Sequence, residues 1–148
     1  MHALNNAVGK QWQTIDEMRF AVDDYLETQR FEGLPEVRAE HVKPSGWYSS
    51  EVMSHAVNST SMRRSGAIEY ALSLEPLHMN PGVLCGSVGA VVNISNRHWC
   101  AIRQIGNQIW FLDSQEPRPL PMTDAEYRAF IMRHRNAFPL RAVSNLHL

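Results

Sequence analysis

The spacing of apolar residues predicts a long helix in the first part of the chain. Thr14 and Glu17 have the spacing of a capping box, in which a hydroxyl and a carboxylate close the start of a helix. Apolar side chains then recur at helical intervals: Ile15, Met18, Val22, Tyr25 and Leu26. Gly33 and Pro35 end this element, and residues 33–46 are expected to be irregular.

A second helix and a strand are expected next. Ser49 or Ser50 would cap the helix, whose inward face would carry Val52, Met53, Ala56 and Val57. Further along, apolar residues alternate with small or polar ones, which is typical of a strand with one buried face: Ile68, Tyr70, Leu72 and Leu74. Residues 75–82 contain two prolines and are expected to form a loop.

The pattern then changes to that of an antiparallel sheet. Residues 88–94 are rich in β-branched side chains without alternation, as in a strand buried on both faces. Residues 98–105 and 108–112 flank Gly106 and Asn107, two residue types that accept positive φ. These two segments therefore predict a β-hairpin.

The last part of the chain is expected to add an extended segment, a helix and a strand. Three prolines keep their segment extended: Pro117, Pro119 and Pro121. Thr123 and Glu126 have the spacing of a second capping box, before a helix that would bury Tyr127, Phe130 and Ile131. A closing strand is expected at 140–143. Helices followed by an antiparallel meander predict an α+β fold in a single domain, residues 1–148.

Composition limits the possible partners. The chain has 148 residues and a formal net charge of −1, and its 14 Lys and Arg residues are scattered. Because no basic patch is interleaved with aromatic residues, nucleic-acid binding is not expected. No apolar run is long enough to span a membrane, and two cysteines do not build a disulfide framework. These features favour a reducing cytosolic or nuclear setting.

His98 and Asp113 are the strongest candidates for catalysis. Side chains alternate along a strand, so His98 shares a face with Cys100. With the turn centred on residues 106–107, Cys100 pairs with Asp113, and His98 lies diagonal to Asp113 at roughly 7–8 Å between backbone positions. An aspartate at that distance can hold an imidazole in one tautomer and stabilise its protonated form. The alternative is a surface histidine near an aspartate at the end of a hairpin.

Three short strings, in order along the chain, resemble the Josephin family of ubiquitin hydrolases. They are HALNN at residues 2–6, RHW at 97–99 and LDS at 112–114. Members of that family are papain-like α+β hydrolases whose catalytic His lies in an HW pair, with the Asn or Asp on the following strand. The glycine–aromatic pair Gly46 and Trp47 resembles the family's lead into its second helix. The resemblance covers essentially the whole chain.

The resemblance implies a cysteine-dependent hydrolase that cleaves the (iso)peptide bond after the C-terminal glycine of ubiquitin and needs no cofactor. Ubiquitin or ubiquitinated proteins would be its partners. His98 would act as general base and then as acid, and Asp113 would orient it. The family's nucleophilic Cys stands three residues before the His that matches His2, and neither it nor the Gln that precedes it is present. We therefore expect a domain truncated just after its catalytic Cys, which as given is inactive.

Two alternatives to this function remain open. One is a papain-like peptidase that acts on another substrate. The other is a catalytically inactive module that binds ubiquitin through the same groove. Cys100 is not expected to replace the missing nucleophile, because it stands beside His98 on one strand and not across a cleft. Cys100 and Cys85 are both expected to be buried packing residues, and their spacing from His98 and Asp113 does not support a metal site.

The remaining candidates have simpler explanations. Asn5 and Asn6 are expected to hydrogen-bond neighbouring loops. Trp99 is expected to pack under the hairpin, and Trp47 and Tyr48 to pack at the entry of the second helix. The other histidines have no motif around them and are expected to be solvated or packing residues: His41, His55, His78, His134 and His147.

Overall fold

The computed structural model describes residues 1–63 and 69–143, and this part of the chain forms five α-helices and six β-strands. The helices are α1 (His2–Val8), α2 (Ile15–Phe31), α3 (Arg38–His41), α4 (Ser50–Arg63) and α5 (Asp124–Arg133), with a 3-10 helix at Pro81–Gly86. The strands are β1 (Glu69–Leu72), β2 (Gly89–Ile94), β3 (His98–Ile105), β4 (Gln108–Leu112), β5 (Leu120–Met122) and β6 (Ala137–Val143).

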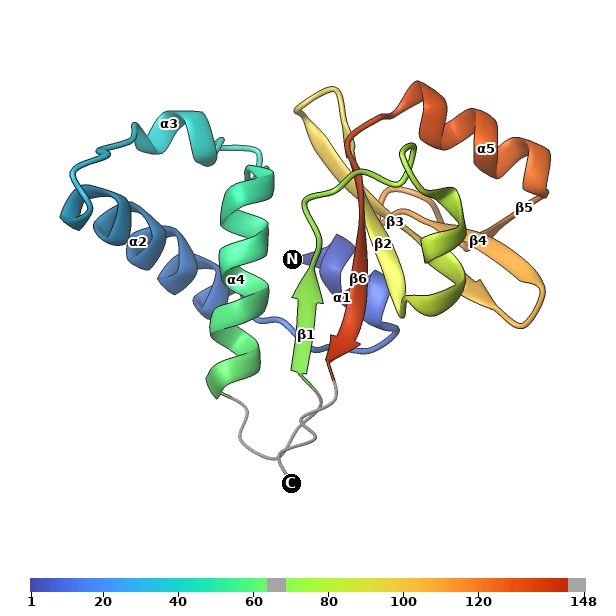
Figure 1. Cartoon of the computed structure of the whole chain (residues 1–148), viewed down its shortest axis with the longest axis horizontal. Helices are drawn as coiled ribbons and strands as arrows, with labels where there is room; N and C mark the ends of the chain where they lie inside the picture. The colour runs from blue at the N-terminus through green and yellow to red at the C-terminus, as the bar shows by residue number, and fades with distance from the viewer. Residues whose placement is uncertain (64–68, 144–148) are drawn as a thin grey trace.

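All six strands join in one antiparallel sheet in the order β1-β6-β2-β3-β4-β5. Helices α2, α3 and α4 form an arm beside the sheet, and α5 lies at the opposite side of the molecule (Figure 1). The predicted α+β fold is therefore confirmed. None of the helices in the described ranges is both long enough and apolar enough to cross a membrane.

Two hydrophobic cores lie on the two faces of the sheet. Side chains of α1, α2 and α4 form the first core together with Trp99 and Ala101 of β3. The second core lies between the sheet and α5, and it includes Cys100. Strand β2 contributes Val91 to the first core and Val92 to the second, which confirms the prediction of a strand buried on both faces.

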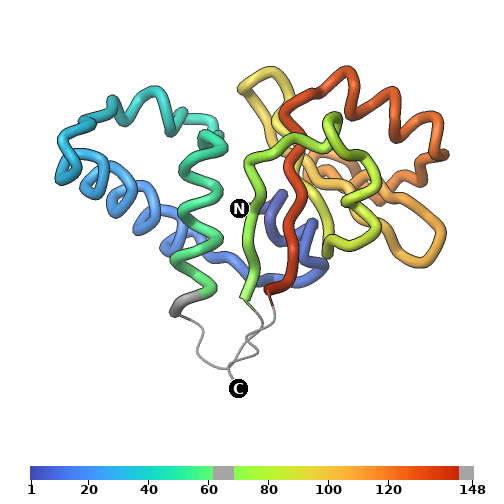
Figure 2. Tube along the Cα trace, viewed as in Figure 1, coloured from blue at the N-terminus to red at the C-terminus, as the bar shows by residue number. Residues whose placement is uncertain are grey.

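Helix α1 lies behind the sheet, and the chain then crosses to the arm and enters α2 (Figure 2). It packs so closely on β2 that a Cβ added to Gly89 would lie 2.4 Å from the carbonyl oxygen of Ala7. Asn5 fixes the crossing segment, because its Oδ1 accepts hydrogen bonds from the backbone N–H groups of Trp12 at 3.0 Å and Gln13 at 2.6 Å. The prediction that Asn5 binds a neighbouring loop is confirmed.

The predicted capping groups are present at three helices. The Thr14 hydroxyl accepts from the Glu17 backbone N–H at 3.1 Å, and the Thr123 hydroxyl accepts from that of Glu126 at 3.1 Å; both capping boxes are complete. Ser49 is the residue before α4, and its hydroxyl oxygen accepts from a backbone N–H of the first turn. The four side chains expected on the inner face of α4 are fully buried: Val52, Met53, Ala56 and Val57.

The structure differs from the sequence-based expectations at several points. The stretch expected to be irregular contains α3, and the last strand starts at Ala137, three residues earlier than expected. The extended proline segment pairs with β4 as β5, where Pro121 is tolerated because the strand lies at the sheet edge. Ile15 and Leu74 were expected to be buried but are exposed. Ile68 and His147 lie outside the described residues.

Candidate active site

The His98 and Asp113 side chains meet where β3 begins and β4 has just ended. His98 Nε2 lies 2.7 Å from Asp113 Oδ1. The hairpin pairs Ala101 with Leu112, and the same register one residue further places Asp113 opposite Cys100. Both the register and the contact between His98 and Asp113 are as the sequence predicts. The catalytic role of the pair is a separate matter and remains a prediction.

Asp113 holds one nitrogen of the imidazole and leaves the other available. The same Oδ1 atom accepts the backbone N–H of Gln115 at 2.9 Å, which fixes the carboxylate. Because a carboxylate accepts hydrogen bonds, its contact with Nε2 favours the tautomer that carries a proton on Nε2. Within the described residues, Nδ1 of His98 has no hydrogen-bond partner, so its lone pair can take a proton from a nearby group.

The Asp113 and His98 side chains differ in how far they are exposed to water. The Asp113 side chain is 13% exposed, whereas that of His98 is 26% exposed. The orienting carboxylate is therefore sheltered from water, and the ring remains accessible. This arrangement suits a histidine that exchanges protons with a bound substrate.

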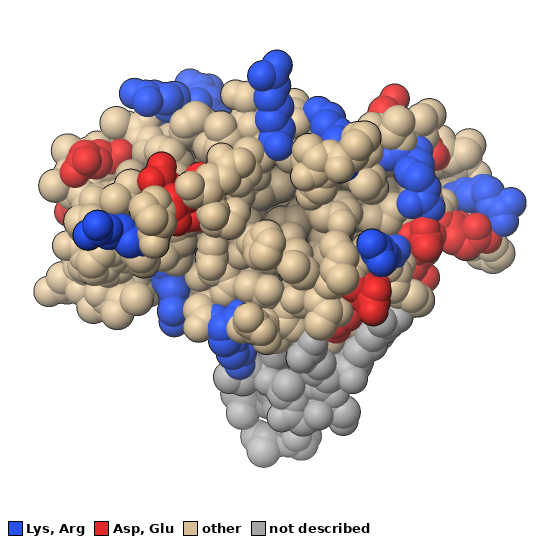
Figure 3. Space-filling model, turned by 180° about the vertical axis from the view of Figure 1, so that it is seen from behind, with Lys and Arg blue, Asp and Glu red and all other residues tan. Residues whose placement is uncertain are grey.

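A small cavity of about 190 Å³ opens beside His98 and joins segments that are far apart in the sequence. Met1, His2 and Ala3 at the start of α1 form one wall, and Ser45 to Trp47 before α4 form another. Met1, His2 and His98 therefore line one cavity, which places the start of α1 beside the imidazole. Seen from behind, the surface is hollowed near its centre, and most charged side chains lie around the periphery (Figure 3).

The loop before α4 is fixed against the sheet by its two aromatic residues. Trp47 Nε1 donates to Asn93 Oδ1 at 3.0 Å, and Lys43 Nζ lies 4.7 Å from the centre of the Trp47 ring. Trp99 Nε1 donates to the Tyr48 carbonyl oxygen at 2.6 Å. All three aromatic side chains are buried, which confirms the packing roles expected for them. Hydrogen bonds to Asn93 and from Trp99 therefore fix the loop that forms this wall of the cavity.

Neither cysteine of the chain has the environment of a nucleophile at this site. Cys100 is 1% exposed, and burial, with a further contribution from the Asp113 charge, raises the pKa of its thiol to about 12. It remains a neutral thiol in the core, as expected. Cys85 was expected to be buried as well, but this prediction was wrong: it is exposed on the 3-10 helix, where its thiol donates to Gln104 Oε1. The 3-10 helix buries Leu84 in the second core and leaves the adjacent Cys85 exposed, so an apolar neighbour in the sequence did not indicate burial.

Several polar contacts of histidine could not be predicted from the sequence. His55 Nε2 lies 2.7 Å from Asp24 Oδ2 and links α4 to α2. His41 is buried and contacts both Glu36 and Ser49. Burial lowers the pKa of His134. In the part of the chain that the structure describes, no three His, Cys, Asp or Glu side chains gather as a set of metal ligands.

The structure is an α+β domain in which His98, at the start of β3, and Asp113, just after β4, are in contact beside a cavity that the start of α1 lines. A family model described as Josephin matches residues 1–137, so the chain belongs to the Josephin family. The family is of the deubiquitinase type and has a cysteine-protease-like fold. A search among curated proteins gave no match to the chain.

Proposed function

We propose that this domain provides the catalytic frame of a cysteine-type deubiquitinase that cleaves the bond after the C-terminal glycine of ubiquitin. The observation that carries the proposal is the contact of His98 Nε2 with Asp113 at a cavity formed by the start of α1. Membership of the Josephin family gives the class of chemistry. Ubiquitin is the proposed partner because the family is ubiquitin-related.

The proposed reaction needs a cysteine just before α1, where the family motif has it. Met1 and His2 line the cavity that also contains His98, so a Cys two residues before Met1 would be near the imidazole. Its thiolate would attack the carbonyl carbon, with the proton held on His98. His98 would then give this proton to the departing amine, and a water activated by the same ring would hydrolyse the thioester. Asp113 would hold the ring through Nε2 in both steps.

A protein made of residues 1–148 alone would have no thiol at this position, and we expect such a protein to be inactive. The test compares the 148-residue chain with a form extended at Met1 by the family's Gln and Cys in their motif spacing. A ubiquitin with a fluorogenic amide at its C-terminus is the substrate. We expect turnover only by the extended form and no turnover when its added Cys is replaced by Ser. Turnover by the unextended chain, lost on Cys100→Ala, would overturn the assignment.

The same pair of proteins separates ubiquitin from other substrates. A ubiquitin probe with an electrophilic C-terminus should label the added Cys, whereas a general papain-type peptide electrophile of equal reactivity should label it far more slowly. Equal labelling by both probes would favour a peptidase with another substrate. Binding of ubiquitin without labelling of the added Cys would favour an inactive binding module.

A further inference from the structure

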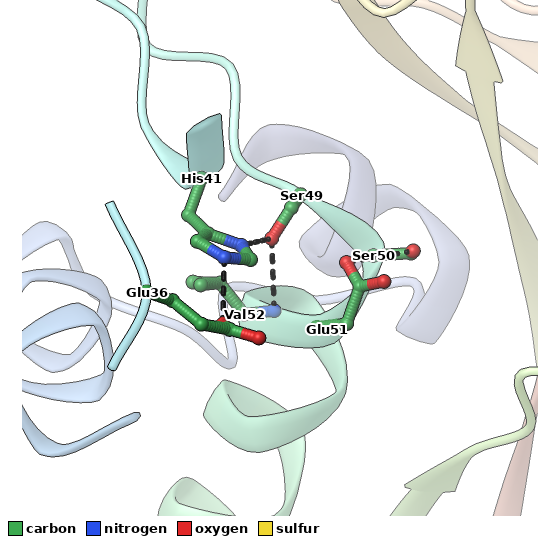
Figure 4. A network of polar contacts seen from close by, with 6 residues as sticks. All are labelled: Glu36, His41, Ser49, Ser50, Glu51 and Val52. Atoms are coloured by element: carbon green, nitrogen blue, oxygen red, sulfur yellow. Dashed lines mark hydrogen bonds and ion pairs between the residues drawn. The ribbon is translucent and has the colours of Figure 1, made fainter. Parts of the chain in front are cut away.

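A second chain of nucleophile, imidazole and carboxylate lies in the arm, away from His98. Ser49 Oγ lies 2.6 Å from His41 Nδ1, and His41 Nε2 lies 2.8 Å from Glu36 Oε2. Figure 4 shows the three side chains in line, with the imidazole between the hydroxyl and the carboxylate. Glu36 comes from the α2–α3 connection, His41 from α3, and Ser49 from the position just before α4. Because no sequence motif joins these three positions, their contact could not be predicted from the sequence.

The donor and acceptor roles in this chain are those of an activated serine. The Ser49 oxygen accepts the backbone N–H of Val52 at 3.3 Å, and its own proton can therefore point to His41 Nδ1. His41 then carries its proton on Nε2 and donates it to Glu36. Tyr25 also binds the Glu36 carboxylate and packs its ring edge-on against His41, at 5.1 Å between ring centres. The imidazole is thus fixed in the tautomer that can accept a proton from the serine.

This chain borders a cavity of about 510 Å³. His41 is 7% and Ser49 is 5% exposed, so both are sheltered but face the cavity that they line. Ser49 also stands at the N-terminus of the 14-residue helix α4. Within the described residues, no hydrogen-bond acceptor contacts the backbone N–H groups of Ser50 and Glu51, which are the first two of the helix. Such groups can stabilise negative charge that develops on a bound carbonyl oxygen.

An ordinary helix cap accounts for only part of this arrangement. A cap requires a side-chain oxygen that accepts a backbone N–H, and it does not require a histidine or a carboxylate behind it. The His55–Asp24 pair shows what a structural contact in the same arm looks like: it joins α4 to α2, and within the described residues no serine, threonine or cysteine side chain hydrogen-bonds to its imidazole. All three histidines place Nε2 on a carboxylate, and His41 differs from His55 in the serine hydroxyl that contacts its Nδ1.

We propose that Ser49, His41 and Glu36 form a second, serine-based acyl-transfer site that acts on small, uncharged carboxylic esters. Ser49 Oγ forms the bond to the carbonyl carbon while its proton passes to His41 Nδ1. The alkoxide of the ester leaves with this proton, and the acyl group remains on Ser49. Water then attacks the acyl carbon, gives its proton to His41, and releases the carboxylic acid as Ser49 recovers the proton.

The cavity walls set the substrate class. Asn93, Asn96 and Asn136 present amide groups that can bind a neutral polar ligand. The carboxylates of Glu40 and Glu51 outnumber the ammonium group of Lys43 in the same walls. An anionic acyl chain would meet this excess of negative charge, and a cavity of about 510 Å³ is large enough for a small ester. The site is independent of the thiol chemistry proposed above, because none of its three residues lines the cavity beside His98.

The test uses the 148-residue chain with diisopropyl fluorophosphate, a small neutral probe in which the serine oxygen displaces fluoride from phosphorus. We expect mass spectrometry to locate the phosphoryl group on Ser49. Ser49→Asn should abolish labelling while it keeps an oxygen that caps α4, so loss of the helix does not explain the result. His41→Gln should slow labelling at least about tenfold because it removes the proton acceptor.

The matched control is His55→Gln, which breaks the other imidazole–carboxylate contact of the arm and should leave the labelling rate unchanged. Hydrolysis of 4-nitrophenyl acetate, corrected for the rate of the Ser49→Asn protein, should follow the same order. Labelling of the native chain no faster than that of urea-denatured chain would overturn the proposal. So would labelling that persists in a folded Ser49→Asn protein, with folding checked by circular dichroism.

Discussion

The His98–Asp113 and His55–Asp24 pairs have the same separation, 2.7 Å, and both histidine side chains are 26% exposed. They differ in the carboxylate: Asp113 is 13% exposed and is held by the Gln115 N–H, whereas Asp24 is 45% exposed. They also differ in surroundings, because His98 lines a cavity at the start of α1 and His55 joins the flanks of two helices. Distance alone therefore does not distinguish a candidate catalytic pair from a structural contact.

The largest difference between the two pairs is expected when the imidazole of each is removed in turn. In the form extended with the family's Cys, His98→Ala should lower kcat/KM for ubiquitin amide hydrolysis by about 10⁴-fold or more, because the acid–base group is lost. His55→Ala should change it by less than about threefold, since it removes only a contact in the arm. Steady-state assays of both variants check this. Similar losses in the two would show that the arm contact matters as much as the site.

A second test examines the carboxylates. Asp113→Ala should lower kcat/KM by about 10²- to 10⁴-fold, because the ring loses the group that fixes its tautomer. Asp113→Asn should cost less than about tenfold, since an amide oxygen still accepts the proton of His98 Nε2. Asp24→Asn is the control and should have no effect on turnover. If Asp113→Ala retained full activity, the orienting role of Asp113 would be wrong.

A third test concerns the support of the His98 site by α1. Gly89→Ala places a methyl group 2.4 Å from the backbone oxygen of Ala7, which must move away. We expect a loss of about 2–3 kcal/mol in the free energy of unfolding, as for other overpacked cores. Gly86→Ala is the matched control, because a Cβ there meets nothing within 4 Å. Urea denaturation of both variants checks the difference, and equal stabilities would show that α1 can shift at little cost.

The smallest expected effect is on the stability that the His55–Asp24 pair gives to the arm. Asp24→Asn should lower the free energy of unfolding by no more than about 1 kcal/mol, because both partners of the pair are partly exposed to water. The measurement is again urea denaturation, at low and at high salt. A loss that is larger, or one that does not diminish with salt, would mean that the pair contributes more to the arm than its exposure indicates.

The contact between His98 and Asp113 could be predicted because a tight turn fixes the register of a hairpin. Gly106 and Asn107 set that turn, and every cross-strand neighbour follows from it. The contacts of Glu36, His41 and Ser49 have no such rule. They depend on how α3 folds back on α4 within a stretch without clear periodicity. The exposure of Cys85 was also missed, because a short 3-10 helix has too few residues to show which side is buried.

The position of the last strand was the other feature that local pattern did not reveal. The sequence predicts a closing strand near residue 140, but its partners are set by the packing of the whole sheet. In the structure, β6 pairs Leu72 with Leu140 on one side and Gly89 with Leu140 on the other. Leu140 is fully buried as a result. Sequence reasoning found this strand as an element but could not place it in the sheet.

The insertion of β6 between β1 and β2 has a consequence for the time at which this domain can fold. During synthesis, β1 and β2 leave the ribosome well before the strand that joins them, so neither can pair with its final neighbour at residues 137–143. Until then both strands expose unpaired backbone edges, which are prone to aggregation. The hairpin of β3 and β4, which carries His98 at one end, contains only local contacts and can form earlier. In a nascent chain, the hairpin that carries His98 would therefore form before β6 completes the sheet.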